Sequence, residues 1–164
     1  MGDPRKQRRK YSRPTHPWQI ERINEENELM RKYGLKNKKE IWRAHSRITN
    51  YRRIARELLG NPGEHAEKEG KKLLDKLNRL GLMDSHNLED VLALTIEDLL
   101  ERRLQTVVYR KGLSSTIRQA RQMIVHGHIM VGGRKVTVPS FLVYKGREDL
   151  VELNPKLQKK VIKE

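Results

Sequence analysis

Cysteine is absent from the 164-residue sequence. This absence excludes disulfides, thiol catalysis and cysteine-ligated zinc together. The N-terminus carries no apolar segment of the kind found in secretory signals. No run of residues approaches the roughly 18 apolar positions that a membrane-spanning helix needs. We therefore expect an intracellular, water-soluble protein without a membrane partner.

Aromatic residues and catalytic patterns are also scarce. Phe141 is the only phenylalanine, which disfavours an RNA-recognition sheet with stacking aromatics. No glycine-rich phosphate loop with its lysine occurs, and no Ser-His-Asp order has supporting context. His126 and His128 are close in sequence, but alternate residues at a turn should point in different directions, which disfavours a metal site. The sequence predicts a protein that is not an enzyme and that needs no cofactor or metal.

Positive charge, in contrast, is abundant. Lys and Arg number 36 against 21 acidic residues, which gives a formal net charge of +15. Such a surplus favours a polyanionic partner, because like charges on a compact protein repel one another. Leu, Ile, Val and Phe make up 41 of the 164 residues, above the roughly 20% below which highly charged chains stay disordered. We expect a modest core in one domain or two small ones.

The first basic region is the N-terminal arm, residues 1–17, which contains three prolines and almost no apolar residue. It cannot pack by itself, so it is either a solvated tail or a segment held by an acidic partner such as a phosphate backbone. The second basic region, residues 31–56, has ten basic residues against one acid. Solvated faces usually mix charges of both signs, so this one favours nucleic-acid contact through Arg43, Arg47 and Arg53. Trp42 is expected to be structural rather than a base-stacking residue.

Apolar spacing and stop signals predict helices at residues 18–33 and 38–59, a third from the turn at 61–63 to Leu80, and one at 96–111. The stretch from Asp84 to Glu101 is acidic and contains no Lys or Arg. Asn87 and Thr95 each precede an acid by three positions, which indicates capping boxes at two helix starts. This local role explains most of these acids, while a contact with a basic neighbouring protein stays open.

Residues 113–138 form the most informative unit. Ser114 and Ser115 are helix N-cap candidates, and three apolar residues then follow with helical spacing: Ile117, Ala120 and Ile124. Three polar residues should point outward together: Arg118, Arg121 and Gln122. We expect Gly127 to end the helix in the left-handed conformation. The Gly132-Gly133 pair between alternating runs predicts a type I′ hairpin, with Arg134 and Lys135 just past its tip. Residues 141–143 and 150–153 should complete a small antiparallel sheet.

The surrounding segment is basic throughout, since residues 102–147 contain ten basic residues and no acid. Glu101 to Val136 resembles the RNA-binding domain of small-subunit ribosomal protein four (the "S four" family). The landmarks are Arg103-Leu104, Tyr109-Arg110, Ser115, Ala120-Arg121-Gln122, His126-Gly127-His128 and Gly133. Residues 2–18 resemble the archaeal and eukaryotic branch. Two turns depart from the family pattern. One contains Gly132, and in the other Gly146 and Asp149 are separated in the sequence.

The expected fold is α+β, with a helical N-terminal region, a basic extended arm, and a small RNA-binding domain of helices packed on a short antiparallel sheet. The expected division is 1–17 basic arm, 18–101 helical N-terminal domain, 102–153 RNA-binding domain and 154–164 basic C-terminal tail, helical or frayed. The residues expected to bind ribosomal RNA are Arg5, Arg8, Arg9, Lys10, Arg13, Arg43, Arg47, Arg53, Arg102, Arg103, Arg110, Lys111, Arg118, Arg121, Gln122, His126, His128, Arg134 and Lys135. Contact should rest on phosphates and RNA shape, with bases secondary.

The resemblance implies a structural protein of the small ribosomal subunit, in the cytoplasm, that binds small-subunit ribosomal RNA at a multi-helix junction and nucleates assembly. It also implies neighbours, notably protein five, contact with mRNA where it enters the subunit, and a contribution to decoding accuracy. Two alternatives stay open: a paralogue acting in small-subunit biogenesis, and a free RNA-binding heat-shock protein. The intact arm and the dense basic run favour the ribosomal protein.

Overall fold

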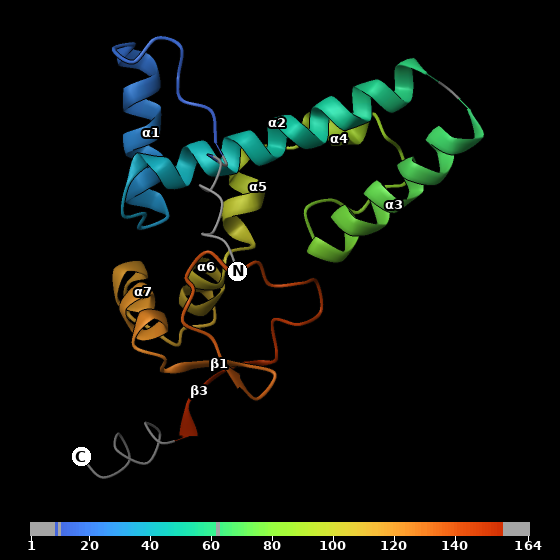
Figure 1. The fold of residues 1–164 in the computed structure, drawn as a ribbon. Coiled ribbons are helices and arrows are strands. Elements are labelled where there is room, and N and C mark those ends of the chain that lie inside the picture. Colours follow the sequence, from blue (N-terminus) through green and yellow to red (C-terminus); the bar gives the residue numbers. More distant parts are fainter. Residues whose placement is uncertain (1–8, 10, 62, 156–164) are drawn as a thin grey trace, which may run out of the picture.

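The computed structural model describes residues 9, 11–61 and 63–155. A helical region lies above a smaller unit of two helices and a short sheet (Figure 1). The helices are α1 (Ile20–Lys32), α2 (Lys38–Gly60), α3 (Glu64–Leu80), α4 (Asp90–Ala93), α5 (Ile96–Glu101), α6 (Leu104–Arg110) and α7 (Ile117–Val125). The strands are β1 (Ile129–Val131), β2 (Arg134–Lys135) and β3 (Val151–Leu153). The predicted α+β fold is confirmed. Within the described residues, no helix is long and apolar enough to cross a membrane.

Helix α2 organises the N-terminal region. It is 23 residues long and spans this region in Figure 1, with α1 near one end and α3 near the other. Its buried residues follow the predicted spacing of three and four: Ile41, Ala44, Ile48, Tyr51 and Ala55. Gly34 and Gly81, after α1 and α3, have φ angles of 57° and 67°, a left-handed conformation that glycine adopts without steric cost.

The single helix predicted at 96–111 is wrong, because α5 ends at Glu101 and α6 begins at Leu104. Between them Arg103 is extended, with φ −70° and ψ 141°, and bridges Leu142. The Leu104 amide donates to the Phe141 carbonyl at 2.7 Å, and the Val143 amide donates to the Arg102 carbonyl at 2.9 Å. Contacts with a segment some 40 residues later therefore break the helix, although the helical spacing of apolar residues continues across the break.

Two of the cap predictions are corrected. Thr95 forms the predicted capping box at the start of α5, but Asn87 caps nothing, because α4 begins after Glu89 without a side-chain cap. At α7 the cap is Thr116, whose hydroxyl accepts from the amide of Gln119 at 3.2 Å. Ser115 hydrogen-bonds to the Gln119 side chain instead. The predicted N-terminus was therefore one or two residues early.

The sheet has strand order β2-β1-β3 and is antiparallel throughout. Gly132 and Gly133 have φ angles of 56° and 75°, so both central positions of the β1–β2 hairpin have the positive φ that a type I′ turn requires. Residues 141–143 do not form the predicted strand; only the isolated bridge between Leu142 and Arg103 occurs there. The predicted tail lies outside the described residues from 156 onward.

Two hydrophobic cores stabilise the structure. The first is built by α1 to α5, and its buried residues run from Tyr33 to Leu100. The second lies between α6, α7 and the sheet, with Leu104, Ile124 and Ile129 fully buried. The division between the cores falls at the break between α5 and α6, and Leu142, from beyond that break, also packs against the first core.

Candidate nucleic-acid interface

The described part of the arm lies along α2. The Ser12 amide donates to the Ser46 hydroxyl of α2 at 2.9 Å, and the rings of Tyr11 and Trp42 have centroids 6.0 Å apart. The guanidinium carbons of Arg9 and Arg43 lie 5.8 and 5.9 Å from the Tyr11 ring centroid, within the range of a cation–π contact. The predicted RNA-binding residues Arg5, Arg8 and Lys10 lie outside the described residues. The arm thus brings its cations to those of α2.

We call Arg9, Arg13, Arg43 and Arg47 the arm surface. All four are exposed, and none has an ion-pair partner among the described residues. Arg53, further along α2, is exposed but pairs with Glu57 one turn later at 2.5 Å. An exposed pair of this kind contributes little to stability, so Arg53 remains accessible to an anion.

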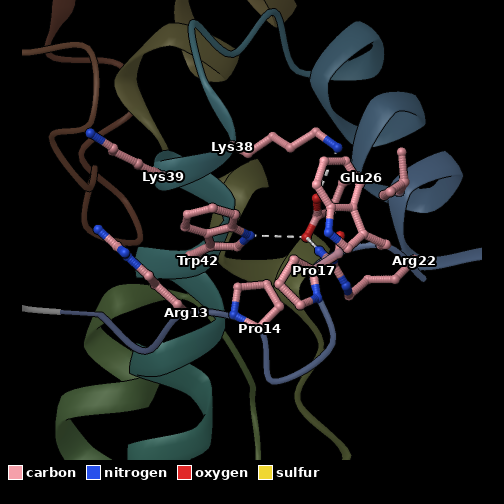
Figure 2. A pocket seen from close by; sticks show the side chains of 10 residues that line it. Arg13, Pro14, Pro17, Arg22, Glu26, Lys38, Lys39 and Trp42 are labelled. Carbon is pink, nitrogen blue, oxygen red and sulfur yellow. Dashed lines mark hydrogen bonds and ion pairs between the residues drawn. The ribbon is translucent and has the colours of Figure 1, made fainter. Parts of the chain in front are cut away.

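A buried carboxylate, Glu26 of α1, supports this region. We call Glu26 with Arg22, Lys38 and Trp42 the Glu26 cluster (Figure 2). Glu26 is only 4% exposed; it accepts from the Trp42 indole at 2.9 Å, from Arg22, and pairs with Lys38 at 3.2 Å. Burial alone would raise the pKa of Glu26, but the hydrogen bonds from Trp42, Lys38 and Arg22 hold it below its ordinary value. Trp42 therefore has the structural role predicted for it.

The second basic group is the hairpin surface: Arg118 of α7, and Arg134 and Lys135 of β2. All three are exposed and have no ion-pair partner within the described part of the chain. The Lys135 stem crosses the turn after α7, because a Cβ at Gly127 would lie 1.7 Å from the Lys135 Cε. Gly127 also has φ 73°, as predicted. Glycine is needed here both for the turn and for the path of this lysine.

His126 and His128 flank that turn, with His126 and Gln122 exposed and His128 half-buried. Their rings stack with centroids 5.9 Å apart and an interplanar angle of 13°. The expectation that they point in different directions is therefore wrong. The described residues contain no group of three or more His, Cys, Asp or Glu that could hold a metal ion.

Two of the predicted RNA-binding arginines are bound within the protein. Arg103 is 6% exposed and its Nη2 lies 2.6 Å from Glu40 Oε2, while Arg121 Nη2 lies 2.8 Å from Glu40 Oε1. We call Glu40, Arg103, Gln105 and Arg121 the Glu40 cluster. Burial would raise the pKa of Glu40, but hydrogen bonds and charge from Arg121 and Arg103 hold it below its ordinary value.

The expectation that Arg118 and Arg121 are presented together to RNA is corrected for Arg121. The acid that pairs with it lies on α2, 81 residues earlier in the chain, so the acid-free run at 102–147 could not reveal it. Arg103, buried in the same cluster, cannot present its side chain to RNA in this structure either.

Gln105 is a buried polar residue between the two units that the sequence does not reveal. It is 1% exposed, and its amide nitrogen donates to the carbonyls of Tyr33, Gly34 and Ile117 at 3.0–3.3 Å. A Cβ at Gly34 would lie 2.7 Å from Ile117 Cγ2, so glycine permits this close approach of the two units. No sequence signal marks it, because Gln105 is not among the apolar positions that give the helix predicted at 96–111 its buried stripe.

The remaining predicted cations have mixed roles. Arg102 has a side chain 17% exposed, donates to the Val143 carbonyl at 2.8 Å and pairs with Glu148 at 2.6 Å. Arg110 pairs with Glu101 at 2.5 Å but is 65% exposed, and Lys111 lies 3.7 Å from the fully exposed Asp149. Arg102 is therefore largely structural, whereas Arg110 and Lys111 remain accessible.

Comparison with known proteins decides the family. The family model of the S4 domain matches residues 102–149. The small ribosomal subunit protein uS4 of Methanothermobacter thermautotrophicus is 53% identical over 156 residues, 94% of this chain and 91% of that protein. The uS4 proteins of Ignicoccus hospitalis and Sulfolobus acidocaldarius are 55% and 51% identical, each over 94% of this chain and over 94% and 89% of their own lengths. The chain belongs to the uS4 family.

The resemblance to the archaeal branch of this family is thereby confirmed. The prediction that the chain is not an enzyme is confirmed as well, because its relatives are proteins of the small ribosomal subunit. For a uS4 protein, the structure separates two kinds of arginine within the S4 domain. Arg118 and Arg134 face solvent, whereas Arg103 and Arg121 join that domain to α2.

Proposed function

We propose that this protein is a structural component of the small ribosomal subunit in the cytoplasm and binds small-subunit ribosomal RNA directly. The observation that carries the proposal is the presence of two exposed basic surfaces, arm and hairpin, on a chain of the uS4 family. Phosphates supply most of the affinity in complexes of this kind, since each neutralised phosphate releases counterions.

The Glu40 cluster supports a more specific role in assembly. It ties α2, which carries Arg43 and Arg47, to the domain that carries the hairpin surface. Two basic surfaces held at a fixed angle can neutralise phosphates of two RNA helices at once and so favour the geometry of a multi-helix junction. We expect the protein to nucleate folding of such a junction by this means.

The proposed contact residues follow from the exposures described above. The arm and hairpin surfaces, with Arg53, Arg110, Lys111, Gln122, His126 and His128, would contact RNA directly. Arg5, Arg8 and Lys10 are also proposed as RNA contacts, and this part of the proposal rests on the sequence alone. Arg102, Arg103 and Arg121 would act indirectly, by holding the domain in place. The division into segments 1–17, 18–101, 102–153 and 154–164 is likewise proposed.

Finer roles belong to the same proposal. Contact with protein five, contact with mRNA where it enters the subunit, and a contribution to decoding accuracy would follow from a uS4-like position. The alternatives are a subunit biogenesis factor and a free heat-shock RNA binder. Mass spectrometry of purified mature subunits separates them: a stoichiometric amount supports the ribosomal protein, and presence only in precursors contradicts it.

Salt dependence tests the binding mode. Affinity for small-subunit ribosomal RNA should fall linearly on a double-logarithmic plot against salt, with a slope of roughly 0.7–0.9 per phosphate contacted. Filter binding between about 50 and 200 mM salt measures this slope. A nearly flat titration would contradict phosphate-dominated binding.

A further inference from the structure

A groove lies where the arm meets α1 and α2. Its volume is about 520 Å³, and its apolar wall is formed by Pro14, Pro17, Trp18 and Trp42. Pockets of 300–1,000 Å³ are typical of sites for small organic ligands, so this groove is large enough for a single nucleotide. It adjoins the arm surface, with which it shares Arg13, and its apolar wall has no part in the phosphate contacts proposed above.

Trp18 is the most unusual residue of the groove. It is 87% exposed, and no hydrogen bond or ring contact joins its indole to any described residue. A single exposed apolar side chain needs no explanation. Here, however, the exposed indole stands with two prolines and Trp42 around one hollow, and these are the only two tryptophans in the chain.

Charge identifies the kind of ligand that fits. Arg13 and Lys39 are exposed and have no ion-pair partner within the described residues. In Figure 2 their cationic ends lie on one side of the Trp42 ring, opposite Glu26. The Glu26 carboxylate is itself paired with Arg22 and Lys38, so the groove has no uncompensated negative charge. An apolar wall beside two free cations matches a planar base that carries a phosphate.

We propose that this groove holds one unpaired nucleotide of the small-subunit ribosomal RNA. The base stacks against Trp18 along the apolar wall, and its phosphate meets Arg13 and Lys39. Unpaired bases are recognised by stacking on aromatic side chains, which tolerates any sequence because every base has a π-face. The inference rests on the proposed function and extends it from phosphate contact to base contact. A neutral protein segment would leave both cations without a partner.

Tryptophan fluorescence reports on this site directly, because both tryptophans line the groove. Adding small-subunit ribosomal RNA should quench the emission of the native protein. A single-stranded RNA hexamer should also quench it, whereas a fully paired duplex of the same sequence should bind without quenching. Trp18→Ala should bind the ribosomal RNA about tenfold more weakly, the size expected for one stacked base, and Trp18→Phe should recover part of the loss.

Ile20→Ala is the matched control, since Ile20 is 73% exposed near the same end of α1 but does not line the groove. It should leave both quenching and affinity unchanged. Filter binding separates the possible failures. Three results would each overturn this inference alone. Trp18→Ala could bind with native affinity, duplex and hexamer could quench equally, or the emission could change only when other subunit proteins are added. No RNA binding by the native protein overturns the proposed function together with it.

Discussion

Glu26 is buried and Glu40 is half-buried, and each carboxylate is held by two cations, yet the two have different structural roles. The partners of Glu26 lie within residues 22–42, on α1 and α2. The two arginines on Glu40 lie 63 and 81 residues further along the chain. The Glu26 cluster therefore joins neighbouring helices beneath the arm, whereas the Glu40 cluster joins two separate cores.

The degree of burial of the cations differs as well. Arg22 and Lys38 have side chains 23% and 31% exposed, so water can solvate them if the carboxylate is lost. The Arg103 side chain is 7% exposed and has no such access. The comparison shows that removing one partner of an ion pair costs more stability when the remaining charged group is buried away from water.

Glu40→Ala should produce the largest effect on stability. Removing the carboxylate leaves Arg103 buried without a counter-charge, and breaking a buried pair in this way costs about 3–5 kcal/mol. Urea denaturation measures the change in the free energy of unfolding. Glu57→Ala is the matched control, because Glu57 and Arg53 are both 58% exposed on the same helix, and it should cost at most about 1 kcal/mol. Equal losses in the two variants would contradict the role of the Glu40 cluster.

Glu26→Ala should destabilise the protein less, by about 1–3 kcal/mol, because the loss is mainly that of the buried hydrogen bond from Trp42. The same urea titration compares it with Glu40→Ala. The emission spectrum of the variant should also shift, since the Trp42 indole loses its acceptor at 2.9 Å. A loss as large as that of Glu40→Ala would remove the distinction between the two clusters.

Arg118→Ala and Arg121→Ala should separate RNA contact from domain attachment. Arg118 has no described ion-pair partner, so its loss should weaken RNA binding about tenfold while leaving the melting temperature unchanged. Arg118→Lys should rescue only part of this, because the bidentate fork is lost. Arg121→Ala should instead lower the melting temperature. Filter binding and thermal melts on both variants check this, and identical behaviour would argue against two classes of arginine.

The smallest expected effect is one of pH. Both glutamates have pKa values below the ordinary value of 4.5 in the folded protein, so each carboxylate stabilises the fold fully above about pH 4.5 and loses this effect as pH falls through its lowered value. The stability advantage of the native protein over Glu40→Gln should therefore be constant from about pH 7 to 5 and shrink as the pH falls below about 4.5. An advantage that grows on acidification would contradict the lowered pKa. Urea midpoints at these pH values provide the measurement.

Local signals predicted much of the fold. The buried stripe of α2 was visible because Ile41, Ala44 and Ile48 repeat with helical spacing. The hairpin was visible because two adjacent glycines between alternating residues satisfy one turn type. The break at Arg103 was not visible, since the interactions that cause it come from Phe141 and Val143 while the apolar spacing continues unchanged.

The binding surface was predictable only in part, for the same reason. Charge counting found every cation, but whether a cation is free depends on residues brought close by the fold. Arg118 and Arg121 are three positions apart on one helix; one faces solvent and the other reaches Glu40. No property of residues 102–147 distinguishes them, because the deciding acid belongs to α2.

The long span of the Glu40 cluster also sets an order of events during synthesis. Chains fold from the N-terminus as they emerge, and the buried residues of the first core end at Leu100, before Arg103 and Arg121 have been made. Until then Glu40 stays a hydrated carboxylate on the surface of α2. The nascent N-terminal unit can therefore fold first. Its Glu40 carboxylate is then already in place for Arg103 and Arg121 to bind. When the S4 domain docks, the two arginines reach Glu40 across 63 and 81 residues of chain. Because most of that chain is already folded, closing these loops costs less conformational entropy.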